Sequence, residues 1–367
     1  MDPLKQQQLA MPTVEVFLSI EEQLLINIAK QLKKHKSLLT EENIVSWQTE
    51  QLSMLGNLTQ QNIIAIAKHS GMAVNEVTKA LEQAGYSTLQ EYEGELQEAV
   101  SLGYLIAPPN IEASLALQDV LATFQQQAIE TFNMVNTTML QQSQQVYLDI
   151  VNQTVGKVLA GTMTPQEALR ESVESWADTG VPALIDRRGR KWSTEAYLNQ
   201  VMRSTVNNVA NEMQDTRMDE FGVDLVEVSS HLGARPRCAP FQGRIFSRSG
   251  THSKYPALAT TSYGEPAGLK GVNCRHLFYP YIEGVSRKTY KPYDEKKNRA
   301  VYEESQQQRL LERQIRKAKR ELLMMEEIGD TEGINAAKKK IRDRQADMRA
   351  FIDDTGRTRN RQREQIY

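Results

Sequence analysis

The residues most able to do chemistry gather in one stretch of the chain, residues 231–276. Two thiols and two imidazoles there match the ligand set of a closed, tetrahedral structural zinc site, namely His231, Cys238, Cys274 and His276. Only one residue separates Cys274 from His276, so on an extended segment both side chains point to the same side. The spacing from His231 to Cys238 is wider, and no CxxC pair is present. The stretch is therefore a candidate zinc site with an unusual spacing.

Three other interpretations of the same stretch stay open. The cysteines could be small buried residues while the histidines make hydrogen bonds, or the two thiols could form one disulfide bridge. Nucleophilic catalysis would need a thiolate stabilised by nearby positive charge, which Arg235, Arg237 and Arg275 could supply. No third residue that would orient a catalytic histidine is evident. The chain also has no Gly-rich phosphate loop, HExxH or GxSxG motif, so the commonest enzyme signatures are absent.

Arginines in this region could bind phosphates or carboxylates, because guanidinium groups match both geometries. Arg237, Arg244 and Arg248 are the candidates for contact with nucleic acid. The alternative is that such arginines bond backbone carbonyls and hold loops together. Residues 231–286 contain 7 of the chain's 20 glycines and 5 of its 12 prolines. We therefore expect loops and short strands that depend on side chains for their structure.

Helices must position this region. Residues 111–159 contain no proline and repeat apolar residues at intervals of three and four, which predicts one long amphipathic helix or two nearly collinear ones. Thr164 and Pro165 mark the start of a shorter helix. Strand, turn and strand follow, with the turn at Arg188 and Gly189. Alternation over residues 223–229 then predicts a strand that leads into the Gly- and Pro-rich stretch.

A second helix is expected from Ser193 or Thr194 to Phe221, because either hydroxyl could cap its first turn. Arg203, Asn207 and Asn211 would form a polar row on it at intervals of four residues. That row could line a pocket or could simply face solvent.

Residues 14–105 show shorter helical patterns separated by turn signals. Thr59 could cap one helix, Gly71 would break it, and residues 74–84 would form the next. Two helices around such a turn resemble a helix-turn-helix. The segment is acidic and has no arginine, which favours packing or docking over DNA reading.

The C-terminal part predicts an antiparallel helical hairpin. Apolar residues step by three and four over residues 311–325, "GDTEG" interrupts the pattern, and residues 334–348 resume it. Basic side chains dominate the remaining faces, and the last twelve residues form a basic tail. Residues 1–230 carry 15 Lys and Arg against 29 Asp and Glu, whereas residues 231–367 carry 29 against 17. A basic half suggests a polyanion partner or docking on an acidic surface, although a solvated charged face would give the same composition.

The composition also limits where the protein acts. No apolar run approaches the roughly 18 residues that span a bilayer, so no membrane association is expected. The start of the chain has no basic cluster followed by an apolar core, so we expect no secretory signal. Two cysteines in 367 residues exclude a disulfide framework and suit a reducing compartment such as cytoplasm.

Several motifs that recur in one order give residues 180–290 a family resemblance. "GRKWSTEAYLNQVMRSTVNNVANE", "DLVEVSSHLGARPRCAPFQGRIFS" and "TSYGEPAGLKGVNCRHLFYPYIEG" resemble the phage minor capsid protein 2 family. That family is similar to MuF-type head morphogenesis proteins, whose pattern is RPxHA, then Gly, then GxNCR. Cys238 stands where the related pattern often has histidine, an exchange that keeps a zinc ligand but would disturb a mechanism that needs imidazole. The motif residues expected to be structural are Arg235, Pro236, Gln242, Gly243, Gly271, Asn273 and Arg275.

The resemblance implies a minor structural protein of a tailed-phage head. Its expected partners are the portal protein and other capsid or scaffold proteins, in the capsid interior near the portal after synthesis in the host cytoplasm. Contact with packaged DNA is a hypothesis that rests on the basic charge of residues 231–367. Its expected role is in capsid morphogenesis or in DNA packaging or ejection. The alternative is a head-carried Cys/His or metal-dependent hydrolase or nuclease centred on residues 231–276.

The expected fold is mainly α with a small α+β domain. An elongated helical N-terminal part comprises a docking region, residues 1–105, and a long-helix region, residues 106–179. The Gly- and Pro-rich α+β domain covers residues 180–290, and the basic hairpin and tail cover residues 291–367.

Overall fold

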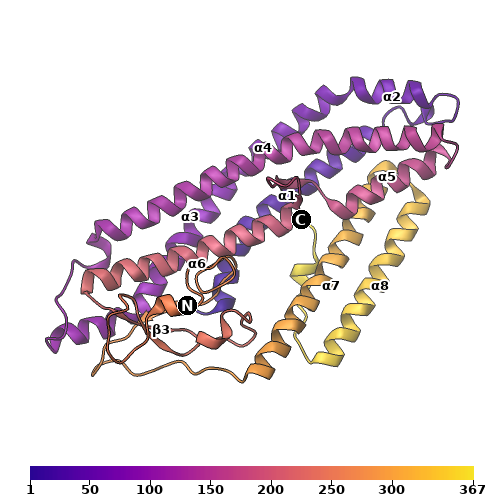
Figure 1. Cartoon of the computed structure of the whole chain (residues 1–367). Coiled ribbons are helices and arrows are strands. Elements are labelled where there is room, and N and C mark those ends of the chain that lie inside the picture. The colour runs from indigo at the N-terminus through magenta and orange to yellow at the C-terminus, as the bar shows by residue number, and fades with distance from the viewer. The chain divides into compact units, whose positions relative to one another are not determined.

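The computed structural model describes all of residues 1–367, and the chain is mainly α-helical with a small α+β part, which confirms the expected fold class (Figure 1). The helices are α1 (Pro3–Lys33), α2 (Ile44–Ser53), α3 (Leu55–Ser101), α4 (Leu115–Leu159), α5 (Pro165–Thr179), α6 (Thr194–Phe221), α7 (Glu295–Ile328) and α8 (Thr331–Thr355). The strands are β1 (Pro182–Ile185), β2 (Lys191–Ser193), β3 (Leu225–Val228), β4 (Ile245–Ser247) and β5 (Phe278–Pro280). Short 3-10 turns are η1 (Lys36–Leu38), η2 (Ile111–Ala113), η3 (Ala239–Phe241), η4 (Leu258–Thr260) and η5 (Arg361–Glu364).

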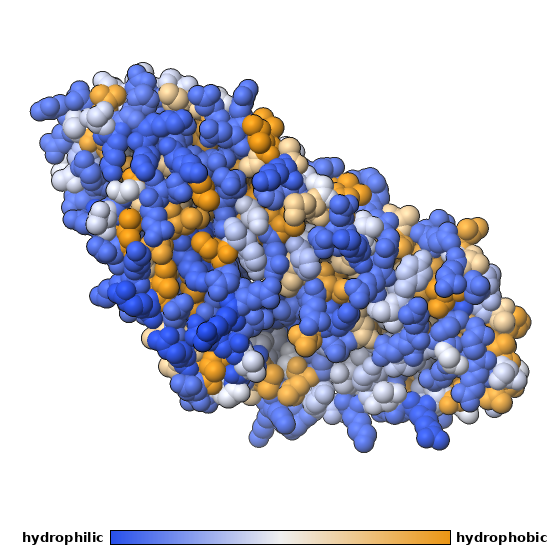
Figure 2. All heavy atoms as spheres, turned by 180° about the vertical axis from the view of Figure 1, so that it is seen from behind, coloured by the Kyte–Doolittle hydropathy of each residue, from blue (hydrophilic) through white to orange (hydrophobic).

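The chain forms two compact units, each drawn from three stretches of sequence. Unit 1 comprises Met1–Val14, Val74–Thr131 and Asn199–Ser305, and unit 2 comprises Glu15–Ala73, Phe132–Leu198 and Gln306–Tyr367. The four segments expected from the sequence stay a prediction about the organisation of the chain. No helix combines the length and the apolar character needed to cross a bilayer. On the face shown in Figure 2, hydrophilic residues predominate and hydrophobic ones are scattered among them.

Local sequence signals determine several element boundaries as predicted. A capping box starts α5: the Glu167 backbone N–H donates to the Thr164 hydroxyl at 3.4 Å, and the Thr164 N–H donates to the Glu167 carboxylate at 3.1 Å. β1 and β2 form the expected antiparallel pair, with Gly189 at a φ of +76° in the turn. Helix α6 ends at Phe221, as its pattern predicted.

The structure confirms the prediction for one of the two longest helices, α4, and contradicts it for the other, α3. Helix α4 is one uninterrupted helix of 45 residues, which confirms the prediction for residues 111–159 apart from the η2 turn that precedes it. The predicted break at Gly71 is wrong, because α3 runs through it over 47 residues. A glycine inside a helix costs about 1 kcal/mol. Burial of Ile66, Ala73 and Val77 on either side outweighs that cost, so no helix-turn-helix forms.

The C-terminal helical hairpin is confirmed. Helices α7 and α8 lie side by side in Figure 1, and Leu311 and Ile315 of α7 share an apolar cluster with Met348 of α8. Asp330 caps α8 by accepting the N–H of Gly333 at 3.2 Å. The end of α7 meets the start of α8 where Met325 lies against Gly333, and the middle of α7 meets the later part of α8 at Met348, as an antiparallel pair requires.

The basic tail is anchored within unit 2 by acidic partners. Both guanidinium nitrogens of Arg359 that face Glu364 donate to its carboxylate at 2.5 Å. Arg363 lies 3.6 Å from the carboxylate of Glu312, and the backbone N–H of Tyr367 donates to Glu22. Charge pairing thus orders a segment that the sequence alone describes only as basic.

A three-stranded sheet organises the Gly- and Pro-rich stretch of unit 1. The strand order is β4-β3-β5, all antiparallel, and Val226 at the centre pairs with Phe246 on one side and Pro280 on the other. The apolar core around the sheet includes Met218 and Phe221 from α6. It also includes both cysteines, so the candidate chemical residues lie inside a core rather than on a surface.

Candidate functional site

The sheet of unit 1 brings the two histidines of the candidate site together. His231 follows β3 and His276 precedes β5, and in these antiparallel neighbours Val228 pairs with Phe278. The two imidazole rings stack, with centroids 4.6 Å apart and planes inclined by 29°. Strand pairing, which the spacing along the chain does not reveal, makes these side chains neighbours.

Three of the four expected zinc ligands lie close together. The sulfur atoms of Cys238 and Cys274 and one ring nitrogen of His276 lie within 4.8 Å of one another, and all three residues are buried. His231 lies beside this group rather than in it. Its Nδ1 lies 3.4 Å from the Leu232 carbonyl oxygen, and its buried Nε2 has no hydrogen-bond partner. The structure therefore assembles three ligands and places the fourth candidate next to them.

One chain of hydrogen bonds orients His276. Its Nδ1 lies 3.5 Å from the sulfur of Cys274, and its Nε2 lies 3.2 Å from Oε1 of Gln242. The same Oε1 accepts the backbone N–H of His231 at 2.7 Å. A backbone N–H can only donate, so this atom of Gln242 is the carbonyl oxygen, and Nε2 of His276 carries the proton. His276 therefore turns an unprotonated Nδ1 toward the sulfur.

The two thiols differ in their affinity for a proton. The hydrogen bond with Cys274, followed by burial, raises the pKa of Cys238 above its usual value, while the charge of Arg235 opposes that rise. The same hydrogen bond, helped by His276 and opposed by burial, lowers the pKa of Cys274. Burial lowers the pKa of His231 to about 3, so its ring is neutral near pH 7. The pKa of Cys274 therefore lies below that of Cys238.

Two of the motif glycines stand where a side chain would collide with backbone. At Gly243, with a φ of +62°, a Cβ would lie 2.9 Å from backbone atoms of residues 290–292. At Gly271 a Cβ would lie 2.4 Å from the carbonyl oxygen of Glu265. Both glycines therefore allow loops to pack closely around the cluster.

The other motif residues support the same loops through their backbones. The Arg235 carbonyl accepts the N–H of Cys238 at 2.9 Å, and Pro236 between them is exposed. Asn273 adopts a left-handed φ of +58° just before Cys274. The carbonyl of Arg275 accepts a hydrogen bond from the side chain of Gln6 at 3.3 Å. These contacts hold the backbone on either side of the ligands.

The polar row on α6 faces the core and not the solvent. Asn211 donates to the carbonyl of His276 at 3.0 Å and accepts the N–H of Phe278 at 3.1 Å. Asn207 accepts a hydrogen bond from Gln6 at 3.2 Å, and both asparagines are buried. The solvent-facing interpretation is therefore wrong for these two residues. The amide of Asn211 satisfies the backbone that leads into β5, and the Oδ1 of Asn207 accepts from the side chain of Gln6.

The three arginines expected to contact nucleic acid differ in their surroundings. Arg237 forms an exposed ion pair with Glu265. Arg248 donates to Asp219 at 2.7 Å and to the Val223 carbonyl at 3.2 Å. Arg244 is exposed, and its side chain makes no hydrogen bond or ion pair. Two of the three guanidinium groups thus already have partners that offset their charge.

A basic segment that the sequence reasoning did not single out follows β5. Thr289 and Tyr290 donate their backbone N–H groups to the buried carboxylate of Glu227, at 3.0 Å and 2.7 Å. The Tyr290 ring stacks on Tyr279 with centroids 5.6 Å apart. Five exposed side chains without an acidic partner surround this anchor, and we call them the basic strap: Arg287, Lys288, Lys291, Lys296 and Lys297. The run "RKTYKPYDEKK" was the available sequence signal.

A buried ion-pair network in unit 1 was also not foreseen. The fully buried Arg217 donates to both carboxylate oxygens of Glu93, to Glu220 at 2.6 Å and to the Pro109 carbonyl at 2.8 Å. Its guanidinium also lies 4.6 Å from the ring centroid of Phe221. Because Arg217 lies on α6, Glu93 on α3 and Pro109 in the loop before α4, the network joins these three segments.

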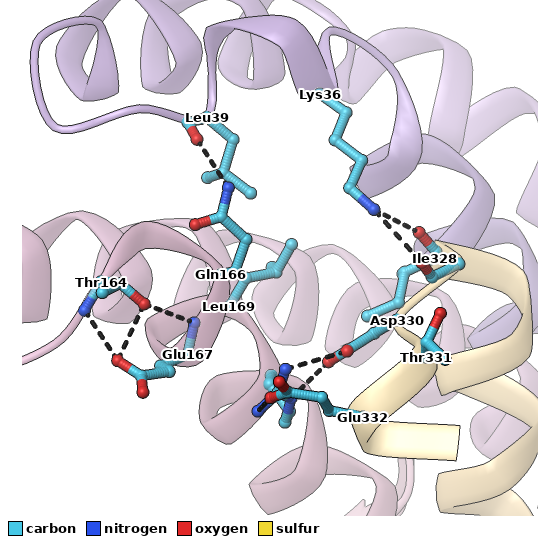
Figure 3. Close-up of a pocket in the computed structure, with 12 residues that line it drawn as sticks. Lys36, Leu39, Thr164, Gln166, Glu167, Leu169, Ile328, Asp330, Thr331 and Glu332 are labelled. Carbon is cyan, nitrogen blue, oxygen red and sulfur yellow. Dashed lines mark hydrogen bonds and ion pairs between the residues drawn. The ribbon is translucent and has the colours of Figure 1, made fainter. Parts of the chain in front are cut away.

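Unit 2 contains a hollow of about 340 Å³ between η1, the start of α5 and the turn from α7 to α8 (Figure 3). The Nζ of Lys36 donates to the carbonyls of Ile328 and Gly329, at 3.4 and 3.3 Å, and Figure 3 shows Lys36 pointing toward Ile328. Arg170 lies against the carboxylate of Asp330, and Gln166 donates to the carbonyl of Leu39 at 3.3 Å. Because these polar groups bond one another, they hold the elements together and leave little capacity to bind a ligand.

Comparison with known proteins finds only phage structural proteins among the matches given below. The family model described as phage minor capsid protein 2 matches residues 1–353. A structural protein of Lactococcus phage LL-H is 32% identical over 343 residues, which are 90% of this chain and 91% of that protein. A structural protein of Lactococcus phage mv4 is 40% identical over 114 residues, which are 31% of this chain and 93% of that protein. No solved structure matches the chain.

Proposed function

The chain belongs to the phage minor capsid protein 2 family, and we propose that it acts inside the head of a tailed phage, next to the portal, where its basic strap contacts packaged DNA. Its role there is in capsid morphogenesis or in DNA packaging or ejection. The observation that carries the DNA contact is the set of five exposed cations of the strap, none of which forms an ion pair, against two acidic residues in the same run, Asp294 and Glu295. Such a set of cations binds the phosphates of DNA independently of the base sequence.

The anchoring of the strap supports this proposal. Two backbone hydrogen bonds to the buried Glu227 and the stacking of Tyr290 on Tyr279 fix the segment before DNA arrives. A Cβ at Gly243 would collide with the strap, so its backbone also packs closely on the η3 loop. A segment whose backbone is already held in place loses less conformational freedom on binding than a flexible one.

The test measures binding of the full chain to duplex DNA as salt rises. Replacing the five strap residues by Gln is expected to weaken binding at low salt and to reduce the salt slope by about 0.9 for each lost phosphate contact. The control replaces two lysines that already have partners, Lys254 beside Glu283 and Lys317 beside Asp178. Binding that is insensitive to salt, or equal in the strap variant and wild type, would contradict the DNA contact.

The position next to the portal has a separate test. Mass spectrometry of purified virions with quantified copies per particle is expected to find the protein at low copy number relative to the major capsid protein. Cross-linking in the virion is expected to join it to the portal protein. Absence from virions would refute the proposed place in the particle.

Burial favours this structural role over a hydrolase or nuclease centred on residues 231–276. Cys238 is 1% exposed and Cys274 is 2% exposed, so a substrate could not reach either sulfur without a rearrangement of the core. The second nitrogen of His276 is bonded to Gln242, a neutral amide that cannot stabilise an imidazolium as the carboxylate of a catalytic triad does.

A further inference from the structure

We propose that Cys238, Cys274 and His276 bind one Zn²⁺ ion that links the η3 loop to the segment before β5 in unit 1. Two thiolates and an imidazole are ligands that zinc prefers. This inference is independent of the proposed contact with DNA.

The distances suit a tetrahedral ion. With a Zn–S bond of about 2.3 Å and a Zn–N bond of about 2.0–2.1 Å, the sulfur and nitrogen of one tetrahedron lie about 3.6 Å apart. Cys274 Sγ and His276 Nδ1 are 3.5 Å apart, and all three ligand atoms fall within 4.8 Å of one another. One edge of the tetrahedron is therefore already formed, and the other two need only small side-chain adjustments.

The protonation of His276 supports the same conclusion. A histidine that binds a metal usually donates its other ring N–H to an oxygen, which fixes the ring and its tautomer. Here Gln242 provides that oxygen, and the backbone N–H of His231 fixes the amide orientation. The lone pair of Nδ1 thus faces the thiols, as coordination requires.

The charges balance in a buried site. Zn²⁺ displaces the thiol protons as it binds, and two thiolates then neutralise the ion. Such a complex avoids the cost of an unpaired charge inside a core. It also suits the surrounding stretch, where strands of three or four residues supply little stability of their own.

A variant of His231 tests whether this residue is a fourth zinc ligand. Its neutral ring stacks on His276, and its Nε2 lacks a hydrogen-bond partner. Because its nitrogens lie outside the group of three, the fourth position belongs to a water molecule in this proposal. Replacing His231 by Phe keeps the ring stack and is expected to leave zinc stoichiometry unchanged.

The experiment uses the full chain purified under reducing conditions, after a thiol titration has shown both cysteines to be reduced. Elemental analysis is expected to find one zinc per chain. After removal of zinc, added Co²⁺ is expected to give the sulfur-to-cobalt charge-transfer absorption of thiolate ligation. A reduced chain that binds neither ion would overturn the proposal, and this arm requires no variant to fold.

Variants locate the ion. Cys274→Ser and His276→Gln are expected to lose stoichiometric zinc, whereas His252→Gln, which alters a histidine elsewhere in unit 1, keeps it. Gln242→Leu removes only the support of His276 and is expected to weaken zinc affinity about 10- to 100-fold. A chelator should lower the melting temperature of the wild type and leave that of Cys274→Ser unchanged. Equal zinc content in the wild type, Cys274→Ser and His276→Gln would show that the ion lies elsewhere and would refute the site.

Discussion

The Gly- and Pro-rich stretch of unit 1 and the α7–α8 hairpin of unit 2 are stabilised in different ways. In residues 231–286, single side chains such as Gln242 and close backbone contacts at glycines hold irregular loops. In the hairpin, an apolar cluster and ion pairs such as Lys338 with Glu326 and Lys340 with Glu321 share the task along two regular helices. Single substitutions should therefore be costly in the stretch and mild in the hairpin, because regular elements distribute their stabilisation over many residues.

Matched glycines give the largest expected contrast. Gly271→Ala would bring a Cβ to 2.4 Å from the Glu265 carbonyl and 2.6 Å from the Pro266 carbonyl, so the backbone must shift, at about 3 kcal/mol of unfolding free energy. Gly356→Ala at the end of α8 meets no atom within 4 Å and costs only the left-handed φ, about 1 kcal/mol. Chemical denaturation of both variants measures the difference. Equal losses would break the comparison.

Two buried glutamines provide the next contrast. Gln242→Leu leaves the N–H groups of His231 and His276 without an acceptor inside the core, and we expect a loss of about 2 kcal/mol. In unit 2, Gln308 accepts a hydrogen bond from Arg357 and donates one to the carbonyl of Thr358. Gln308 itself is buried, but its partner Arg357 is partly exposed and Thr358 is exposed, so water can replace the glutamine as their partner and Gln308→Leu should cost less than about 1 kcal/mol. Thermal unfolding of the two variants checks the order, which a larger loss in Gln308→Leu would reverse.

The contact between the tail and α1 predicts a pH dependence within unit 2. Burial raises the pKa of Glu22 to about 8 in the folded protein, against 4.5 for an unperturbed glutamate. Between these values the folded chain holds a proton that the unfolded chain releases, so the free energy of unfolding should fall as pH rises from about 4.5 to 8. Glu22→Gln keeps an acceptor for the Tyr367 N–H and should remove this slope.

At pH 8 the Glu22→Gln variant should be more stable than the wild type by on the order of 1 to 2 kcal/mol. Denaturation curves at pH 5 and pH 8 measure the slope directly. The exposed Glu41 supplies the control, since Glu41→Gln should leave it unchanged. A wild type whose stability rose over this interval would contradict the buried, protonated carboxyl group.

The smallest effect is expected on the exposed face of α8. Arg344 lies 3.4 Å from Asp347, and both side chains are about half exposed. Such surface ion pairs contribute little, so Arg344→Ala should change the free energy of unfolding by less than about 0.5 kcal/mol. A loss of 2 kcal/mol, measured by the same denaturation assay, would show that the hairpin also depends on single side chains.

Much of the fold was predictable because its signals are local. Thr164 and Glu167 form a capping box within four residues, and the stripe of α7 repeats within each turn, so short-range geometry determines both. The predicted break at Gly71 failed because burial along α3 outweighed the local cost of one glycine. Ion pairs between residues far apart in the sequence, such as Glu93 with the buried Arg217, leave no periodic signal from which they could be predicted.

The sequence by itself determined the helical segments from residue 111 onward, the hairpin, the family and the residue types of the candidate site. It named His231, Cys238, Cys274 and His276 but could not decide which of them meet. Only the tertiary structure decided that, because the pairing of β3 with β5 and the close loop packing at Gly271 bring three ligands together and stack the fourth ring beside them. Distances between residues far apart in the chain follow from packing, which no short-range pattern encodes.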